Sequence, residues 1–113
     1  MKINLLILFC LFVSCNTTNK QLPDNIITEE IFISVLKEAH LAEAAFELSK
    51  SKDVETAEKV LYNTYSEIYS SHNIDKERFE ETLSYYANHP EELEHIYSKV
   101  LKDLLQESAT LNP

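Results

Sequence analysis

The chain has 113 residues, enough for one small domain, and 19 acidic against 10 basic residues give it a formal charge of −9 at neutral pH. This negative charge argues against nucleic acid as a partner and against electrostatic adhesion to anionic lipid. Glycine is absent, which excludes glycine-dependent phosphate loops, dinucleotide fingerprints and most tight hairpin turns. We therefore expect an all-α fold, a small bundle of about four helices.

The first fourteen residues have the pattern of a cleaved signal peptide. Lys2 precedes about nine apolar residues, a run too short to cross a bilayer, which takes roughly 20. The run ends in Ser14-Cys15 with polar residues directly after it, so residues 11–15 resemble a bacterial lipobox. Lipidation at Cys15 is the prediction. The alternative is an ordinary signal peptide followed by a chance cysteine.

Cleavage after residue 14 has two consequences for the remaining chain. Loss of Lys2 moves the formal charge from −9 to −10, so attachment to the membrane would depend on acyl chains at Cys15, of which two or more are needed. Cys10 is also removed, and acylation of Cys15 leaves no thiol for a disulfide or a thiolate metal site. The core alone has to stabilise the fold.

The rest of the chain divides into three parts. Residues 15–25 are polar and include Pro23, so we expect a flexible tether there. A single helical domain is predicted over residues 26–107. The tail over residues 108–113 is expected to fray.

The first helix of this domain should begin after Thr28 and end at about Ser49. Thr28 is a suitable N-cap, and Ile27 and Phe32 are spaced for a hydrophobic staple across it. Apolar side chains lie on two sides of this helix, which is typical of a central helix.

Three further helices follow. Asp53 can cap a second helix over residues 54–72, and Asn73 suits the left-handed position after its end. A third helix is expected from about Asp75, and Pro90 suits the first turn of a fourth.

Two tyrosines of the second helix predict a contact surface. Tyr62 and Tyr69 widen its apolar arc to about 200°, whereas a helix packed on one side needs little more than 100°. The alternative is that both rings lie flat over the core with their hydroxyl groups in water.

Glu43 falls near the middle of the apolar arc of the first helix, between the directions of Phe32 and Leu36. A carboxylate buried there needs a partner, such as a tyrosine hydroxyl or Arg78, or its pKa should rise. Three interpretations remain open: a buried polar residue that fixes the helix register, a ligand or proton-binding group, and a side chain exposed by rotation of the helix.

The histidines offer weak metal sites at most. Glu92 and His95 have the Glu-x-x-His spacing of di-iron bundles, but only one copy is present and His95 should face water. His40 with Glu43 could form half a zinc site, although this spacing is more typical of a surface pair. His72 is expected to complement a helix dipole, and His89 to lie in a turn or at an N-cap; these are the remaining histidines. We expect no metal and no cofactor.

Catalytic motifs are also missing from the pattern. No serine has a positioned base and an oxyanion hole, and Arg78 is the only arginine, which argues against a phosphate-recognition cluster. The sequence predicts no catalytic residues and no enzymatic activity.

Several stretches of the chain resemble a known family. Residues 79–86 (FEETLSYY), His89-Pro90-Glu91-Glu92-Leu93, Ile96-Tyr97 and Val100-Leu101 are similar to the domain-of-unknown-function 4296 family of small Bacteroidota lipoproteins. Val35-Leu36 and residues 40–44 (HLAEA) are similar to the opening motif of that family, so the resemblance covers roughly residues 26–105. It implies a lipid-anchored helical domain in the cell envelope. The family has no assigned reaction or ligand, so it assigns no functional residue.

Two functions fit these observations best. The first is a tethered interaction or accessory module with an envelope protein as partner. The alternative is a carrier or sensor that binds a small apolar ligand between helices, with tyrosines lining the pocket. No acidic run follows Cys15, and such runs resemble the surface-export signals of Bacteroidota lipoproteins. We therefore expect the outer membrane, on its periplasmic side.

Overall fold

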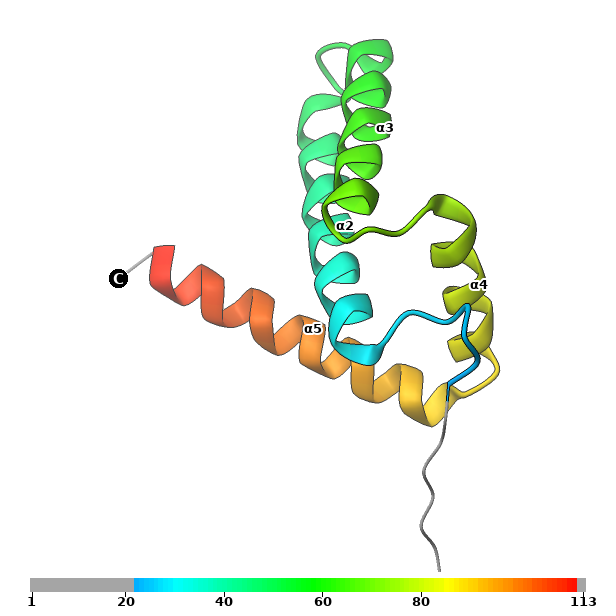
Figure 1. Ribbon diagram of the computed structural model, residues 1–113. Helices are drawn as coiled ribbons and strands as arrows, with labels where there is room; N and C mark the ends of the chain where they lie inside the picture. Colours follow the sequence, from blue (N-terminus) through cyan, green and yellow to red (C-terminus); the bar gives the residue numbers. More distant parts are fainter. Residues whose placement is uncertain (1–21, 112–113) are drawn as a thin grey trace, which may run out of the picture.

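The computed structural model describes residues 22–111, which form four helices joined by short turns (Figure 1). The helices are α2 (Glu29–Ser49), α3 (Val54–Ser71), α4 (Lys76–Ala87) and α5 (Pro90–Leu111). The expected all-α fold is confirmed. Cys15 and the signal peptide predicted over residues 1–14 lie outside the described residues. Within residues 22–111, no helix combines the length and apolar character that a membrane span requires.

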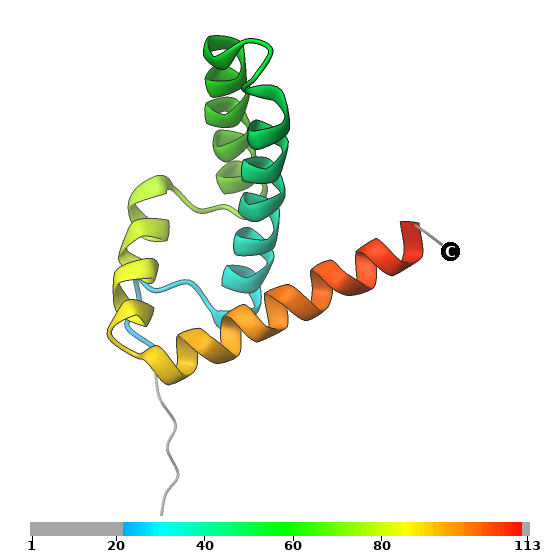
Figure 2. The same cartoon turned by 180° about the vertical axis from the view of Figure 1, so that it is seen from behind.

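α2 and α3 form an antiparallel hairpin, and α5 crosses the first half of α2 steeply (Figures 1 and 2). α4 stands beside the hairpin and packs on the start of α5. α2 therefore contacts both α3 and α5. The second apolar side predicted for it is not buried, since Leu41 is 49% and Leu48 81% exposed. The core lies where the elements meet, and its buried members are Ile26, Ile27, Phe32, Ile33, Val35, Leu36, Ala42, Ile68, Phe79, Tyr86, Ile96 and Val100.

Phe32 lies at the centre of this core. Its ring is fully buried and stacks on that of Tyr86, with the ring centroids 5.2 Å apart, and the Phe79 ring lies 6.0 Å away. Both partners come from α4, so Phe32 joins α2 to α4. Aromatic pairs at these separations stabilise the fold beyond the area they bury.

The segment before α2 is packed against the domain, which changes the predicted tether. Ile26 and Ile27 are buried, Leu22 packs against the core, and the Ile27 N–H donates a buried hydrogen bond of 3.0 Å to the Thr82 hydroxyl of α4. Asn25 donates a further bond of 2.6 Å to Glu81. Residues 22–25 were assigned to the tether. They belong to the domain, because Leu22 packs against the core and Ile26 and Ile27, which follow directly, are buried in it.

The ends of the helices follow the local sequence with one exception. The Asp53 carboxylate accepts a bond from the Thr56 N–H, and Asn73 adopts a positive φ of 55°, as predicted. Thr28 is the N-cap residue of α2, as predicted, but its side chain makes no capping hydrogen bond. The Thr28 carbonyl instead accepts the Phe32 N–H at 2.9 Å. The buried staple residues on either side of it fix the start of the helix without the hydroxyl.

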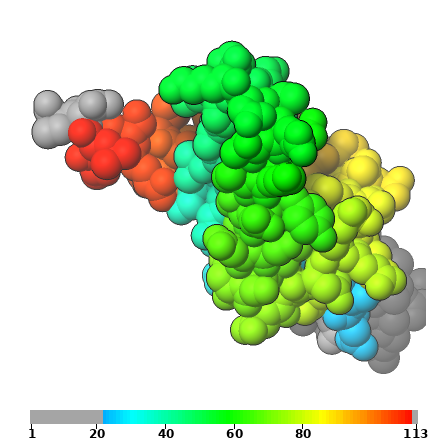
Figure 3. Space-filling model, turned by 90° about the horizontal axis from the view of Figure 1, so that it is seen from above, coloured from blue at the N-terminus to red at the C-terminus, as the bar shows by residue number. Residues whose placement is uncertain are grey.

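The second half of α5 projects beyond the α2–α3 hairpin, as Figure 3 shows from above. The helix continues to Leu111, whereas fraying was predicted from residue 108. Lys37 of α2 pairs with Glu107 at 2.7 Å and supports these last turns. Leu104 still packs against the core, but Leu101 and Leu105 in this half are about 60% exposed.

Candidate functional site

An open groove of about 610 Å³ lies along α3 and α4 on the side of the molecule where these helices diverge. Its apolar floor consists of Leu61, Tyr65 and Tyr69 of α3 with Phe79 and Leu83 of α4. We call this surface the tyrosine groove. Its rim carries Tyr62 and Ser66 of α3, Lys76 of α4 and three glutamates, which are Glu43, Glu58 and Glu80.

A row of aromatic rings connects the groove to the core. The centroid of the Tyr65 ring lies 6.0 Å from that of Tyr69, and Tyr69 lies 5.5 Å from Phe79, which in turn contacts Phe32. Tyr65 and Tyr69 are half-buried and Phe79 is buried. The floor is therefore a rigid extension of the core, held by ring contacts on both helices.

Glu43 lies at the rim of the groove and not in the core. Its side chain is 56% exposed, so the interpretation as a buried polar residue was wrong, and the alternative of an exposed side chain agrees with the structure. Its direction on α2 is close to that of Phe32, but α4 contacts α2 at Phe32 near the start of the helix, and Glu43 lies eleven residues, or about three turns, further along. Periodicity gives the direction of a side chain and says nothing of where its neighbours end.

The expected tyrosine partner of Glu43 is present. The Tyr65 hydroxyl donates a hydrogen bond of 2.6 Å to the Glu43 carboxylate and so ties α3 to α2. Burial, and after it this hydrogen bond, raises the pKa of Tyr65 above its ordinary value of 10.0. Burial, followed by the charge of Glu80, also raises the pKa of Tyr69. Each of the two half-buried tyrosines of the groove thus has one carboxylate that raises its pKa, Glu43 of α2 for Tyr65 and Glu80 of α4 for Tyr69.

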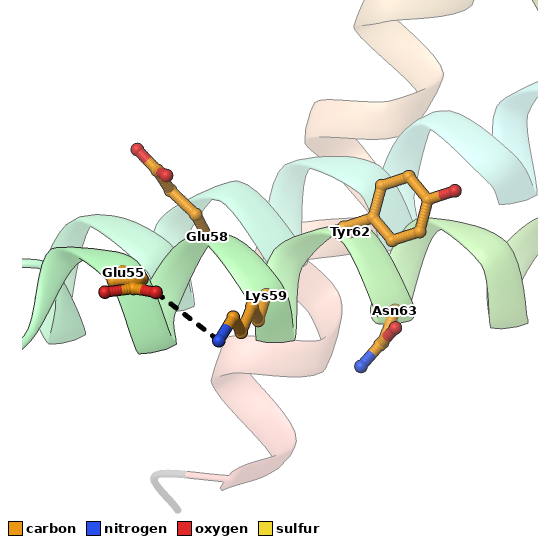
Figure 4. A pocket seen from close by; sticks show the side chains of 5 residues that line it. All are labelled: Glu55, Glu58, Lys59, Tyr62 and Asn63. Atoms are coloured by element: carbon orange, nitrogen blue, oxygen red, sulfur yellow. Dashed lines mark ion pairs between the residues drawn. The ribbon is translucent and has the colours of Figure 1, made fainter.

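Tyr62 and Tyr69, the predicted contact residues, have different environments. The Tyr69 ring packs against the core, which agrees with the alternative to a contact surface, namely that the ring lies over the core. Tyr62 is 75% exposed, and with Glu58 it projects from one side of α3, while Lys59 and Asn63 project from the other (Figure 4). That other side of α3 carries a surface ion pair between Lys59 and Glu55 at 3.5 Å. Tyr62 is therefore free to contact a partner at the groove rim.

The histidines do not converge. His40 lies 3.8 Å from Glu43, forms the expected surface pair and packs near the Tyr97 ring. His95 is exposed, as predicted, and approaches Glu29 at 3.6 Å. Within residues 22–111, no three His, Asp or Glu side chains are grouped as metal ligands.

His72 and His89 lie at helix ends. His72 follows α3 and pairs with Glu38 of α2, so it joins the two helices of the hairpin. The Nδ1 atom of His89 is 2.7 Å from the Tyr85 carbonyl oxygen at the break before α5. Both contacts are accounted for by the packing of helix ends.

The sequence analysis did not identify Tyr65, Glu80 or Leu83 as parts of the site. The spacing of Tyr62, Tyr65 and Tyr69 on one helix was a usable signal. The relative placement of α3 and α4, which decides what faces these rings, has no local signal in the sequence.

The fold and site define an acidic, all-α domain with a solvent-open aromatic groove. The family model for the domain of unknown function DUF4296 matches residues 23–110, and the chain belongs to this family. No curated protein and no solved structure matches the chain.

Proposed function

We propose that this protein is a lipid-anchored, non-catalytic interaction module of the bacterial cell envelope and that the tyrosine groove is its contact surface. The observation that carries the proposal is the groove itself, an aromatic floor continuous with the core and open to solvent along its length. Exposed aromatic surface of this kind is enriched at protein interfaces.

The shape of the groove favours a macromolecular partner. Ligand pockets of 300–1,000 Å³ typically enclose most of a small molecule. The tyrosine groove has a similar volume, but its rim residue Tyr62 is 75% exposed and Glu58 and Glu80 are exposed as well. A small ligand would remain largely in water there, whereas a protein segment could cover both floor and rim.

A carrier or sensor of a small apolar ligand is the second candidate. Leu61, Phe79 and Leu83 give the floor an apolar strip that could accommodate an acyl or aromatic group. This candidate uses the same groove, so one experiment can test both.

The membrane anchor is inferred from the sequence. Cys15 follows an apolar run and Ser14, and polar residues succeed it, which supports acylation there. The position proposed is the periplasmic side of the outer membrane.

Photocrosslinking in intact cells tests the contact surface. The full-length chain would carry p-benzoylphenylalanine at Tyr62 on the groove rim or at Asn63, the next residue of α3, which points away from Tyr62 and does not line the groove (Figure 4). We expect one discrete protein adduct from position 62 and none from position 63. Equal adducts from both positions, or none from either, would contradict the proposal. A small-molecule adduct at position 62 alone, detected by intact mass, would favour the carrier.

A further inference from the structure

The rim of the tyrosine groove has a strong charge bias. Glu43, Glu58 and Glu80 supply three carboxylates, and Lys76 is the single cation among the residues that line the groove. The carboxylates come from α2, α3 and α4, so they surround the floor and do not form a cluster on one helix. A segment in the groove would have negative charge on each side.

The lysine neutralises this charge only weakly. Lys76 approaches Glu80 at 3.8 Å, and the two side chains are 76% and 62% exposed. Ion pairs with this exposure contribute little and are screened by salt. An incoming cation could therefore replace Lys76 beside Glu80 at small cost.

The tyrosines of the groove also favour cations. The face of an aromatic ring attracts Lys and Arg within about 6 Å of its centroid. The aliphatic stems of these side chains can lie along apolar surface while their charged ends reach the rim. An acidic segment would meet like charges, and a purely apolar segment would desolvate the carboxylates without compensation.

We infer that the partner presents a cationic, amphipathic segment to the tyrosine groove, with a large apolar side chain over Leu61, Phe79 and Leu83 and with Lys or Arg beside Glu43 and Glu80. This inference rests on the proposed function and specifies the chemistry of the partner. A second copy of this chain is a poorer occupant, because its formal charge of −9 adds repulsion.

Peptide binding to the full-length protein in phosphatidylcholine nanodiscs tests this chemistry, with empty nanodiscs as the blank. The probe is a fluorescent amphipathic peptide of arginine and leucine. Two control peptides replace either every arginine by glutamine or every leucine by serine. We expect fluorescence anisotropy to show binding of the first peptide only, and the binding should weaken as NaCl increases.

Two double variants locate the binding. Glu43→Gln with Glu80→Gln removes one carboxylate on each side of the floor, and the expected loss of affinity is about tenfold. Glu67→Gln with Glu94→Gln removes the same charge from exposed positions outside the groove, and affinity should change less than about twofold. Circular dichroism checks that both variants retain the helical fold.

The outcomes separate this inference from the proposed function. Equal losses in the two variants, or binding of the glutamine peptide as tight as that of the arginine peptide, would overturn the cationic partner. If the crosslink at position 62 persists undiminished in the Glu43→Gln/Glu80→Gln background, the contact surface stands and the inference on charge fails. A crosslinked peptide that derives from a second copy of this chain also overturns it. Loss of the crosslink in this background, with a Lys- or Arg-bearing peptide identified in the original adduct, supports it.

Discussion

The buried N–H of Ile27 donates a hydrogen bond of 3.0 Å to the hydroxyl oxygen of Thr82, 55 positions later in the chain. Thr82 is fully buried, and its hydroxyl donates a hydrogen bond of 2.8 Å to the Arg78 carbonyl. This one side chain therefore gives the buried Ile27 N–H its acceptor and attaches the segment before α2 to α4.

Thr82→Val should destabilise the domain by about 1–3 kcal/mol. Valine has nearly the same shape, but the buried Ile27 N–H loses its acceptor and the cost is that of an unsatisfied buried donor. Urea unfolding monitored by circular dichroism measures the change. Thr64→Val is the control, because the Thr64 hydroxyl bonds only a carbonyl of its own helix, and it should change stability by less than about 0.5 kcal/mol. Equal effects of the two substitutions would contradict this role of Thr82.

Stability should fall at alkaline pH because of the groove tyrosines. The folded-state pKa of Tyr65 is raised above 10.0, the value for an unperturbed tyrosine, so the unfolded chain loses this proton first. The stabilisation is fully present below pH 10 and is lost as the pH rises from there through the folded-state pKa. Denaturant midpoints measured from pH 8 to 12 should decline above pH 10, and Tyr65→Phe should flatten this decline.

Glu43→Gln separates the two causes of that shift. The substitution removes the charge beside Tyr65 and leaves the burial, so the pKa of Tyr65 should decrease but stay above the ordinary tyrosine value of 10.0. Ultraviolet titration of tyrosinate absorbance, compared with that of Tyr65→Phe, measures it. An unchanged titration would mean that the bond between Tyr65 and Glu43 does not persist in solution.

Glu107→Gln should loosen the end of α5 without unfolding the domain. The ion pair with Lys37 is largely a surface pair, so the free energy of unfolding should change by at most about 1 kcal/mol. Hydrogen exchange of the amides of residues 108–111 should become faster, because this pair holds the projecting half of α5 to α2. Glu94→Gln provides the control, and its effect on these amides should be absent.

Cys15→Ala should abolish fatty-acid labelling and release the protein into the soluble envelope fraction. Cys10→Ala is the matched control, because Cys10 lies inside the apolar run and should be removed with the signal peptide. Metabolic labelling with an alkyne fatty acid and cell fractionation measure both effects. Persistent labelling of Cys15→Ala would exclude this acylation site. Digestion of the protein by protease added to intact cells would contradict a periplasmic location.

Sequence features that act within a few residues predicted the fold well. Asp53, Asn73 and Pro90 mark helix ends through local geometry, and the structure ends the helices within a residue or two of the expected places. Such signals are readable because a cap contacts its own helix.

The site could be predicted only in part, because it depends on contacts between helices. Glu43 lies on the apolar arc of α2, yet its side chain is 56% exposed, while the ring contacts of α4 with α2 are at Phe32, about three turns away. Tyr65 and Glu43 are 22 positions apart in the chain and meet only because α3 packs on α2. Glu80 lines the same groove because of the way α4 is placed relative to α3. Hydrophobic periodicity carries no information on these lengths and angles.

The packed segment over residues 22–28 also limits how far an anchored domain could lie from the membrane. The described chain begins beside the junction of α4 and α5, while the turn between α2 and α3 lies at the opposite end (Figure 1). An acyl anchor at Cys15 would hold that junction close to the bilayer, with at most about 25 Å of chain between them. α2 is about 30 Å long, so such an anchor would keep the groove within several tens of ångströms of the bilayer. Partners would then have to approach from within a shallow layer along the membrane, which confines the encounter to proteins that reach the same height.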